Sequence, residues 1–190
     1  MNKVITQSIA NHKEALAILE KNTQTIEAIA SVCVSSLKSG GKIIFMGNGG
    51  SAADAQHLAA ELVGRFKKER VALPSLALNV NTSILTAIGN DYSYDVVFSR
   101  QIEALAANKD IVIGISTSGN SQNVINAVLA AKKIGAKTIG FLGKDGGKLK
   151  PLVDIDFTVS SHDTPRVQEM HILAGHIICE IIENTLYPNA

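Results

Sequence analysis

The chain has 190 residues, of which 46% are hydrophobic and 18% charged, and its formal net charge is +1. This length suits one compact domain with a sizeable core and is too short for two substantial ones. A net charge so close to zero excludes the broad positive field with which proteins bind long nucleic acids, whereas small anions can still bind at loops and helix ends. The low share of charged residues also indicates that some apolar surface is buried between subunits.

The apolar segments and the cysteines indicate the compartment. Neither the N-terminal segment nor any later stretch has the apolar length that a secretion signal or a membrane span needs. We therefore expect a cytoplasmic protein with no membrane partner. Cys33 and Cys179 each lie in an apolar helical pattern, and we expect two buried, reduced thiols rather than a disulfide.

The chain begins with two helical patterns. Apolar residues recur at helical spacing over 3–20 and 23–38, and Gly40-Gly41 ends the second helix. His12 lies within the first apolar stripe, where we expect it to pack against another helix or subunit rather than to bind a ligand. Residues 1–40 therefore form a predicted N-terminal helical arm.

From residue 42 onward, short apolar runs alternate with helical patterns. The runs lie at 43–46, 76–78, 111–115, 138–142 and 155–159, and the main helical patterns at 52–66, 93–107, 121–134 and 165–186. Runs without polar alternation indicate strands covered on both faces, and their alternation with helices implies a parallel sheet. The sequence thus predicts one domain over 1–190 with an α/β core at 41–190, in which ligands bind at the carboxyl ends of the strands.

The loop after the first strand, Gly47-Asn48-Gly49-Gly50-Ser51-Ala52, opens a helix. Its spacing matches the loose dinucleotide fingerprint, but the second strand ends in Leu78-Asn79-Val80-Asn81 and supplies no ribose-binding acid. A P-loop is excluded because no Gly-Lys-Ser/Thr follows. The three glycines favour close approach of the backbone to a small polar ligand.

The loop after the third strand is Ser116-Thr117-Ser118-Gly119-Asn120-Ser121. Its hydroxyls, its glycine and the free N–H groups at a helix N-terminus make an anion cradle. An ordinary helix cap needs only one hydroxyl, and this loop has four. Because the loop has no lysine or arginine, hydrogen bonds and the helix dipole would meet the charge. We expect it to bind a phosphate monoester.

Two titratable residues lie on the helix that follows the first loop. His57 and Glu61 are four residues apart and therefore share a face. The alanines and leucines around them indicate a mostly buried helix, in which a carboxylate needs a partner or a function. Such a pair can bind a metal or act on a substrate. We interpret residues 65–70 as the solvated end of this helix, from which Arg65 alone can reach a phosphate or sugar.

The final helix carries Gln168, Glu169, His171 and His176 among aliphatic residues. At about 100° per residue, His176 lies roughly 80° from Gln168 and about 20° from Glu169, so the spacing leaves both open as its neighbour. His171 points well away from His176, and we do not expect the two histidines at one site.

These motifs resemble those of the bacterial phosphoheptose isomerases, over nearly the whole chain and in order. The resemblance rests on Gly47–Ser51 with His57 and Glu61, then Gly89-Asn90-Asp91, Gly114–Ser121, Gly143–Gly147, and Arg166–His171 ahead of His176. It implies the flavodoxin-like three-layer sandwich of the sugar isomerase (SIS) group, with a five-stranded parallel sheet. It also implies a homotetramer with active sites shared between subunits.

The resemblance further implies a set of site residues. A metal, usually zinc, is implied at His57, Glu61, Gln168 and His176. The resemblance thereby selects Gln168 rather than Glu169 as the residue that acts with His176. Substrate contacts are implied for Asn48, Gly49, Gly50, Ser51, Asn90, Asp91, Ser116, Thr117, Ser118, Ser121 and Gln168. Thr164-Pro165 departs from the acidic residue that some members carry before the arginine, which puts any substrate contact from that position in doubt.

The implied reaction converts sedoheptulose 7-phosphate to D-glycero-D-manno-heptose 7-phosphate through an enediol, the first step toward ADP-heptose for lipopolysaccharide or another surface glycan. Glu61 is the expected base and His176 the expected acid. Two alternatives stay open. One is a non-enzymatic SIS regulator that binds the replication initiator protein, although its counterparts of Glu61 and His176 are not an acid–base pair. The other is an SIS isomerase of a different sugar phosphate.

Overall fold

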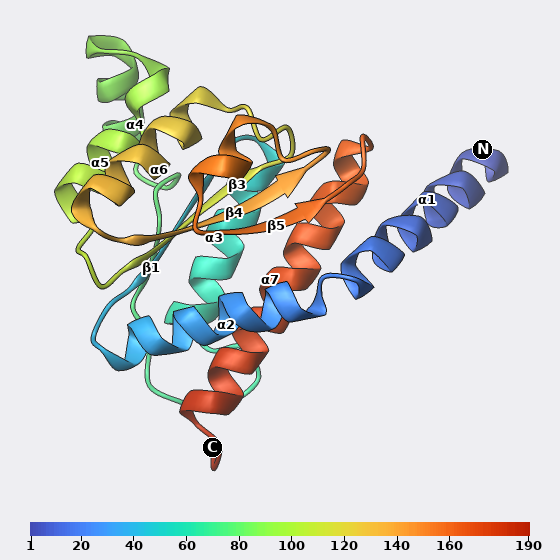
Figure 1. The fold of residues 1–190 in the computed structure, drawn as a ribbon, viewed down its shortest axis with the longest axis horizontal. Helices are drawn as coiled ribbons and strands as arrows, with labels where there is room; N and C mark the ends of the chain where they lie inside the picture. Colours follow the sequence, from blue (N-terminus) through green and yellow to red (C-terminus); the bar gives the residue numbers. More distant parts are fainter.

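The computed structural model describes all 190 residues and places a parallel sheet between layers of helices (Figure 1). The strands are β1 (Ile43–Gly47), β2 (Ser75–Ala77), β3 (Ile111–Ser116), β4 (Lys137–Gly143) and β5 (Ile155–Val159). They lie in the order β2-β1-β3-β4-β5, and every neighbouring pair is parallel. This is the flavodoxin-like arrangement, so the predicted fold is confirmed. The order reverses between β1 and β3, the place where ligands bind in open α/β sheets.

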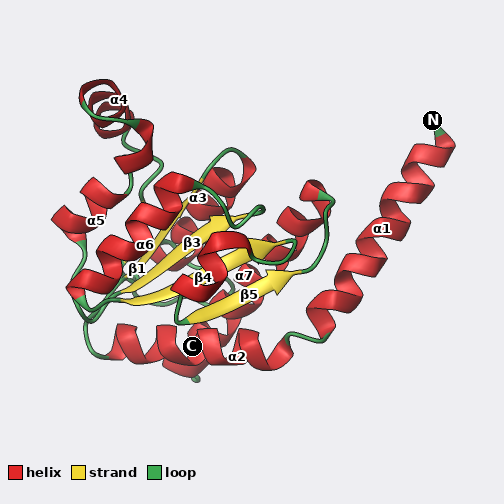
Figure 2. Ribbon diagram, turned by 45° about the horizontal axis from the view of Figure 1, so that its top comes forward, coloured by secondary structure: helices red, strands yellow, loops and turns green.

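Two hydrophobic cores, one on each face of the sheet, explain why the strands carry unbroken apolar runs. Figure 2 shows the helices that lie on either side of the sheet. Ile43 and Phe45 of β1 point to one face, and Ile44 and Met46 point to the other. Helices α2 (Thr23–Lys38), α3 (Gly50–Val63) and α7 (Thr164–Leu186) cover the first face. The second face is covered by α5 (Ser99–Leu105) and α6 (Gln122–Ile134).

Two helix predictions differ from the structure. The pattern at 52–66 predicts a helix to residue 66, but α3 ends at Val63 because Gly64 leaves the helical conformation. The pattern at 93–107 predicts one helix, whereas the chain forms a 3-10 turn (Tyr94–Val96) and then α5. An additional helix, α4 (Thr82–Asp91), begins where the Asn81 side chain accepts a hydrogen bond from the Ile84 N–H. A second 3-10 turn spans Gly147–Leu152.

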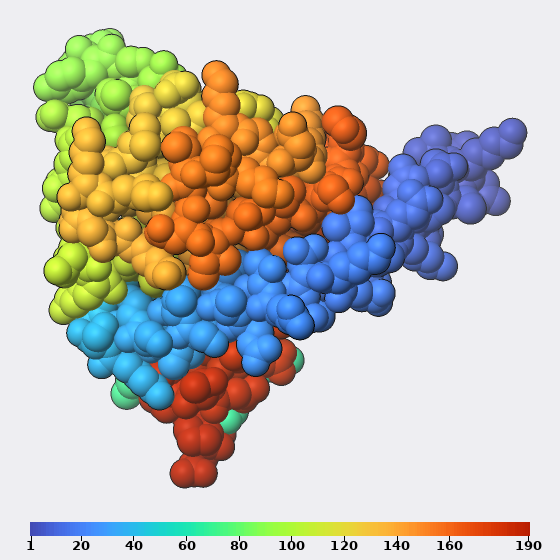
Figure 3. All heavy atoms as spheres, in the orientation of Figure 1, coloured from blue at the N-terminus to red at the C-terminus, as the bar shows by residue number.

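Helix α1 (Asn2–Glu20) projects from the body of the molecule (Figures 1 and 3). Only Ala15 and Leu19 of this helix are buried, while Val4, Ile5 and Ile9 are more than half exposed. The apolar stripe predicted for the arm therefore lies mostly uncovered in the single chain.

Two further predictions can be compared with the structure. Both cysteines are free and buried, as predicted. None of the helices combines the length and the apolar character that spanning a membrane requires.

Candidate active site

Three side chains converge between α3 and α7. His57 Nε2 lies 2.9 Å from Glu61 Oε1 on its own helix and 3.2 Å from His176 Nε2 on α7. The two helices can approach closely here because residue 175 is a glycine, where a Cβ would lie 2.5 Å from Leu58 Cδ2. The His57 side chain is half exposed and that of Glu61 about a quarter exposed, so a ligand can reach the group.

These three residues fit the donor set of a divalent metal. One ligand atom from each of His57, Glu61 and His176 lies within 4.8 Å of the other two. A tetrahedral zinc ion with Zn–N bonds of about 2.0–2.1 Å holds two nitrogen ligands about 3.3 Å apart. The separation of 3.2 Å between the two Nε2 atoms is close to that value. Imidazole and carboxylate ligands suit zinc among other first-row metals.

The surroundings of His176 favour its neutral form. Burial and the neighbouring His57 lower the pKa of His176, and Glu61 raises it by a smaller amount. The Phe66 ring stacks on the His176 ring, with 5.5 Å between centroids and 29° between planes. A neutral imidazole is the form that binds a metal or hydrogen-bonds a substrate oxygen.

The structure separates the two histidines of α7, as the helical spacing predicts. His171 is fully buried and its Nε2 lies 2.9 Å from the Leu142 carbonyl oxygen of β4. It packs against the rings of Phe141 and Phe157, away from His57. His171 is therefore a core residue.

Gln168 and Glu169 make different contacts. Glu169 Oε2 lies 2.6 Å from His12 Nδ1, and Glu169 also pairs with Arg166. Gln168 faces α3, since a Cβ on Gly50 would lie 2.3 Å from Gln168 Nε2. Gln168 is two helical turns before His176, about 12 Å along the axis, and its role as fourth ligand remains a prediction. His12 packs against α7, as predicted for a helix contact.

The loops after β1 and β3 lie side by side at the switch point of the sheet. The side-chain amides of Asn48 and Asn123 donate to each other at 2.9 Å in both directions, which joins the first loop to the start of α6. Gly49 has φ +56°, a conformation that glycine adopts without strain, and it is the N-cap residue just before α3. Ser51 is buried in the first turn of that helix.

The loop after β3 brings three serine hydroxyls together around Ser116. Ser116 Oγ lies 2.9 Å from Ser121 Oγ and 3.5 Å from Ser118 Oγ. Thr117 and Ser118 are partly exposed. Ser121 is the N-cap residue of α6, so the hydroxyls lie beside the N-terminus of this helix. This arrangement can hold a small anion.

Three residues predicted to contact the substrate form no hydrogen bond or ion pair with these groups. Asn90 and Asp91 lie exposed at the end of α4, where the Asn90 side-chain amide donates a hydrogen bond to the Asp91 carboxylate. Arg65 is exposed and pairs loosely with Glu69 at 3.8 Å. Their substrate contacts remain predictions.

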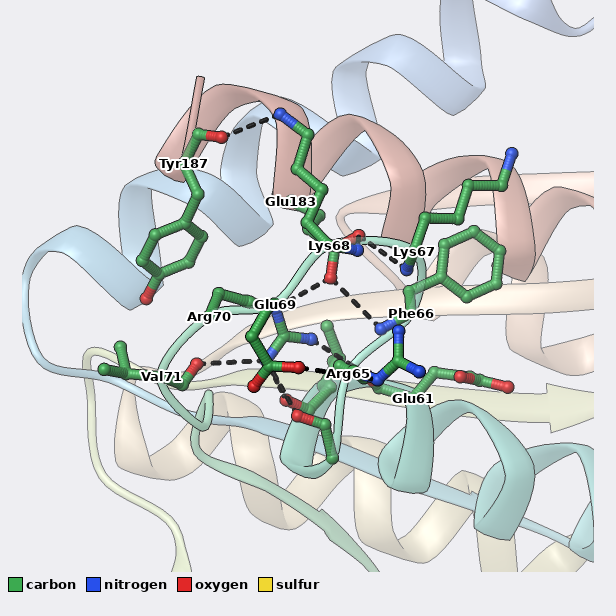
Figure 4. Close-up of polar contacts among 12 residues, drawn as sticks. Glu61, Arg65, Phe66, Lys67, Lys68, Glu69, Arg70, Val71, Glu183 and Tyr187 are labelled. Atoms are coloured by element: carbon green, nitrogen blue, oxygen red, sulfur yellow. Dashed lines mark hydrogen bonds and ion pairs between the residues drawn. The ribbon is translucent and has the colours of Figure 1, made fainter. Parts of the chain in front are cut away.

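The segment after α3 contradicts one prediction. Residues 65–70 were expected to be a solvated helix end, but the Arg70 side chain is fully buried and pairs with Glu183 at 2.9 Å (Figure 4). Glu183 lies amid the apolar residues of α7, where a carboxylate needs a partner. The same reasoning that was applied to Glu61 indicates that Glu183 needs a partner, but it does not identify Arg70 as that partner. Asn123 and Phe66 were also missed, and a local pattern gives no signal for either.

Comparisons with known proteins agree with this geometry. A family model described as the SIS domain matches residues 8–143. The phosphoheptose isomerase of Aliarcobacter butzleri is 56% identical over 98% of this chain and 99% of its own length. That of Geobacter metallireducens is 54% identical over 98% of this chain and 100% of its own length.

The chain belongs to the phosphoheptose isomerase family of SIS-domain proteins. Solved structures support the assignment. The phosphoheptose isomerase from Neisseria gonorrhoeae superposes with a TM-score of 0.92 at 42% identity, over 96% of this chain and 98% of that one. The enzyme from Francisella tularensis gives 0.93 at 34% identity, over 96% and 97%. The resemblance seen in the sequence motifs is confirmed.

Proposed function

We propose that this phosphoheptose isomerase family member converts sedoheptulose 7-phosphate to D-glycero-D-manno-heptose 7-phosphate. The observation that carries the proposal is the convergence of His57, Glu61 and His176 within 4.8 Å of one another on two packed helices. Aldose–ketose isomerisation needs such a group, because one proton moves between neighbouring carbons and another between neighbouring oxygens.

Glu61 is the proposed base that removes the C1 proton of the ketose and returns it at C2. Its Oε1 atom is held by His57 at 2.9 Å, which leaves the second carboxylate oxygen for proton transfer. His176 is the proposed group that exchanges protons with the O1 and O2 oxygens, as a neutral imidazole can do. A zinc ion held by His57, Glu61 and His176, with Gln168 as a fourth ligand, would polarise the carbonyl when bound. A ring nitrogen of His176 that binds the ion cannot also exchange protons, so ligation and proton transfer are alternative roles for that atom.

The hydroxyl loop after β3 is the proposed phosphate site. Ser116, Thr117, Ser118 and Ser121 offer hydroxyls at the N-terminus of α6, whose dipole favours an anion. The first loop, over Asn48–Ser51, lies beside it through the Asn48–Asn123 amide pair. We assign the sugar to this loop and to Gln168, with further contacts from Arg65, Asn90 and Asp91.

We also propose a cytoplasmic homotetramer whose subunits share active sites. Two observations support the assembly: the uncovered apolar stripe of α1, and the exposed position of the contact residues Asn90 and Asp91 on a projecting helix. A neighbouring subunit would cover the stripe and complete the site. The reaction would supply the precursor of ADP-heptose for lipopolysaccharide or another surface glycan.

The regulator and the isomerase of another sugar phosphate are less well supported. The acid–base residues Glu61 and His176 are both present and lie in one group with His57. The phosphoheptose isomerases of Aliarcobacter butzleri and Geobacter metallireducens are identical to this chain at more than half of the aligned positions. Solved SIS proteins of other kinds resemble the chain only in fold, as with an RpiR transcription factor domain at 18% identity and a TM-score of 0.67.

The variant Glu61→Gln tests the assignment of the base. It should abolish turnover of sedoheptulose 7-phosphate while leaving the thermal shift produced by this sugar phosphate largely intact, because the amide keeps the shape but cannot accept the proton. Turnover close to that of the wild type would remove Glu61 as the base.

A further inference from the structure

A buried ion pair lies directly behind the candidate active site. Arg70, in the segment after α3, donates from Nε to Glu183 Oε1 on α7 at 2.9 Å. The two side chains are 0% and 2% exposed, so the pair is shielded from water. Figure 4 shows the polar contacts around it. Charged groups this deeply buried persist only where further hydrogen bonds satisfy them.

The carboxylate of Glu183 fixes the segment that follows α3. Its Oε1 atom also accepts from the Phe66 N–H at 3.1 Å, and its Oε2 atom accepts from the Lys67 and Lys68 N–H groups at 2.7 and 2.8 Å. Each carboxylate oxygen therefore faces two donors. Burial alone would raise the pKa of Glu183, but these donors outweigh it and the pKa lies below its ordinary value.

The guanidinium of Arg70 binds the end of the helix that carries Glu61. Its Nη2 atom donates to the Glu61 carbonyl oxygen at 2.9 Å, and Nη1 donates to that of Leu62 at 2.9 Å. Nη1 also lies 3.3 Å from the Gly64 carbonyl oxygen and 3.0 Å from that of Val71. The last carbonyls of a helix lack partners within it, and a cation there complements the helix dipole.

Both proposed proton-transfer groups are thus tied to this one ion pair. Glu61 is held through its own carbonyl, and His176 is covered by the ring of Phe66, whose N–H is bound to Glu183. We infer that Arg70 and Glu183 are positioning residues for the isomerase, which place the end of α3 and the Phe66 ring against His176. The inference rests on the proposed isomerase function.

A contribution to the free energy of unfolding explains the Arg70–Glu183 pair less well than a positioning role does. Buried ion pairs are often no more stabilising than apolar residues of similar volume, so stability alone does not require one. The hydrogen bonds of the pair also go mainly to backbone groups near Glu61 and Phe66, and not to other residues of α7.

The test compares Glu183→Gln with a matched control, Glu180→Gln. Glu180 lies one turn earlier on α7 and pairs with Lys67 of the same segment, but through an exposed contact at 2.8 Å. A glutamine at 183 must turn its NH2 group toward two donors, whichever way it is oriented. We expect kcat for the heptulose phosphate to fall by about 10²-fold in Glu183→Gln, with KM within threefold of the wild-type value. The control should match the wild type in both constants.

A double-mutant cycle separates positioning from a general loss of folding. Phe66→Leu should also lower kcat, and the double variant with Glu183→Gln should lose little more than Glu183→Gln alone, because both act through one contact. Independently, the imidazole C–H signals of His176 in NMR spectra should move in Glu183→Gln in the direction seen for Phe66→Leu, since the first change displaces the Phe66 ring from His176 and the second removes it. All rates are measured on protein shown by circular dichroism to be folded at the assay temperature.

The possible outcomes are distinct. Unchanged kcat in folded Glu183→Gln, losses that simply multiply in the double variant, or unmoved His176 signals would each overturn the inference. A wild-type enzyme that does not convert the heptulose phosphate would instead overturn the proposed function, and the NMR comparison would still decide whether the ion pair positions the Phe66 ring.

Discussion

The fully buried His171 should make the folded state sensitive to mild acid. Its Nε2 atom lies 2.9 Å from the Leu142 carbonyl oxygen, so the neutral ring donates there, while Nδ1 is buried without a partner. A second proton would have to sit on Nδ1 among the rings of Phe141 and Phe157. Burial accordingly lowers the pKa of His171 from 6.5 to about 4, and the bond to Leu142 offsets part of this effect.

The sign and the size of the effect follow from proton linkage. Between pH 6.5 and about 4 the unfolded chain binds this proton and the folded chain does not, so the free energy of unfolding falls as the pH falls. At about 1.4 kcal/mol per pKa unit, the loss attributable to His171 is roughly 3 kcal/mol when pH 4 is reached. That is a large part of the stability of an ordinary domain.

Urea unfolding at pH 7 and pH 4, at one protein concentration, measures this loss. His171→Gln keeps a donor for the Leu142 oxygen but cannot titrate, and His162→Gln serves as the control because His162 is exposed. The wild type and the control should lose roughly 3 kcal/mol more than His171→Gln over this range. Equal losses in all three proteins would refute the assignment.

Three further predictions concern the two loops and the start of α3. Gly119→Ala should lower the free energy of unfolding by at least about 2 kcal/mol and weaken sugar-phosphate binding, because Gly119 has φ +66° and a Cβ would lie 2.0 Å from the Gly146 carbonyl oxygen; a wild-type melting temperature would contradict this. Replacing Ser116 and Ser118 together by alanine should remove most of the thermal shift produced by sedoheptulose 7-phosphate, and an undiminished shift would exclude this loop as the phosphate site. Asp54→Asn should stabilise the protein at pH 7 by about 1 kcal/mol, after allowance for the solvent around this half-buried group. Burial raises the pKa of Asp54 to about 6, although the neighbouring His57 lowers it. The wild-type protein therefore loses free energy of unfolding as the pH rises from 3.8 to 6. A variant that urea unfolding at pH 7 shows to be less stable than the wild type would refute this reasoning.

The sheet could be predicted because both of its faces are buried, and strands of that kind have unbroken apolar runs in the sequence. Ile43, Ile44, Phe45 and Met46 alternate between the two cores, so each position requires an apolar residue. Helix α4 was not predicted because it is short and none of its residues is fully buried, with only Leu85 and Ile88 packed partly against the second core.

The site was predictable where its geometry is local and unpredictable where it depends on distant contacts. His57 and Glu61 share a helix face, and a spacing of four residues is enough to place them together. The choice between Gln168 and Glu169 depends on His12, which lies in α1 and pairs with Glu169. The burial of Arg70 was not predicted because a run of charged residues at a helix end is usually exposed to solvent. Its partner Glu183 is also 113 residues further along the chain.

The proposed chemistry is tested most directly by following sedoheptulose 7-phosphate with NMR in the presence of the wild-type protein and of Glu61→Gln. We predict that the wild type forms the aldoheptose 7-phosphate until equilibrium is reached, and that Glu61→Gln forms none while still binding the ketose. Failure of the folded, metal-supplemented wild type to form the aldose would contradict the isomerase function.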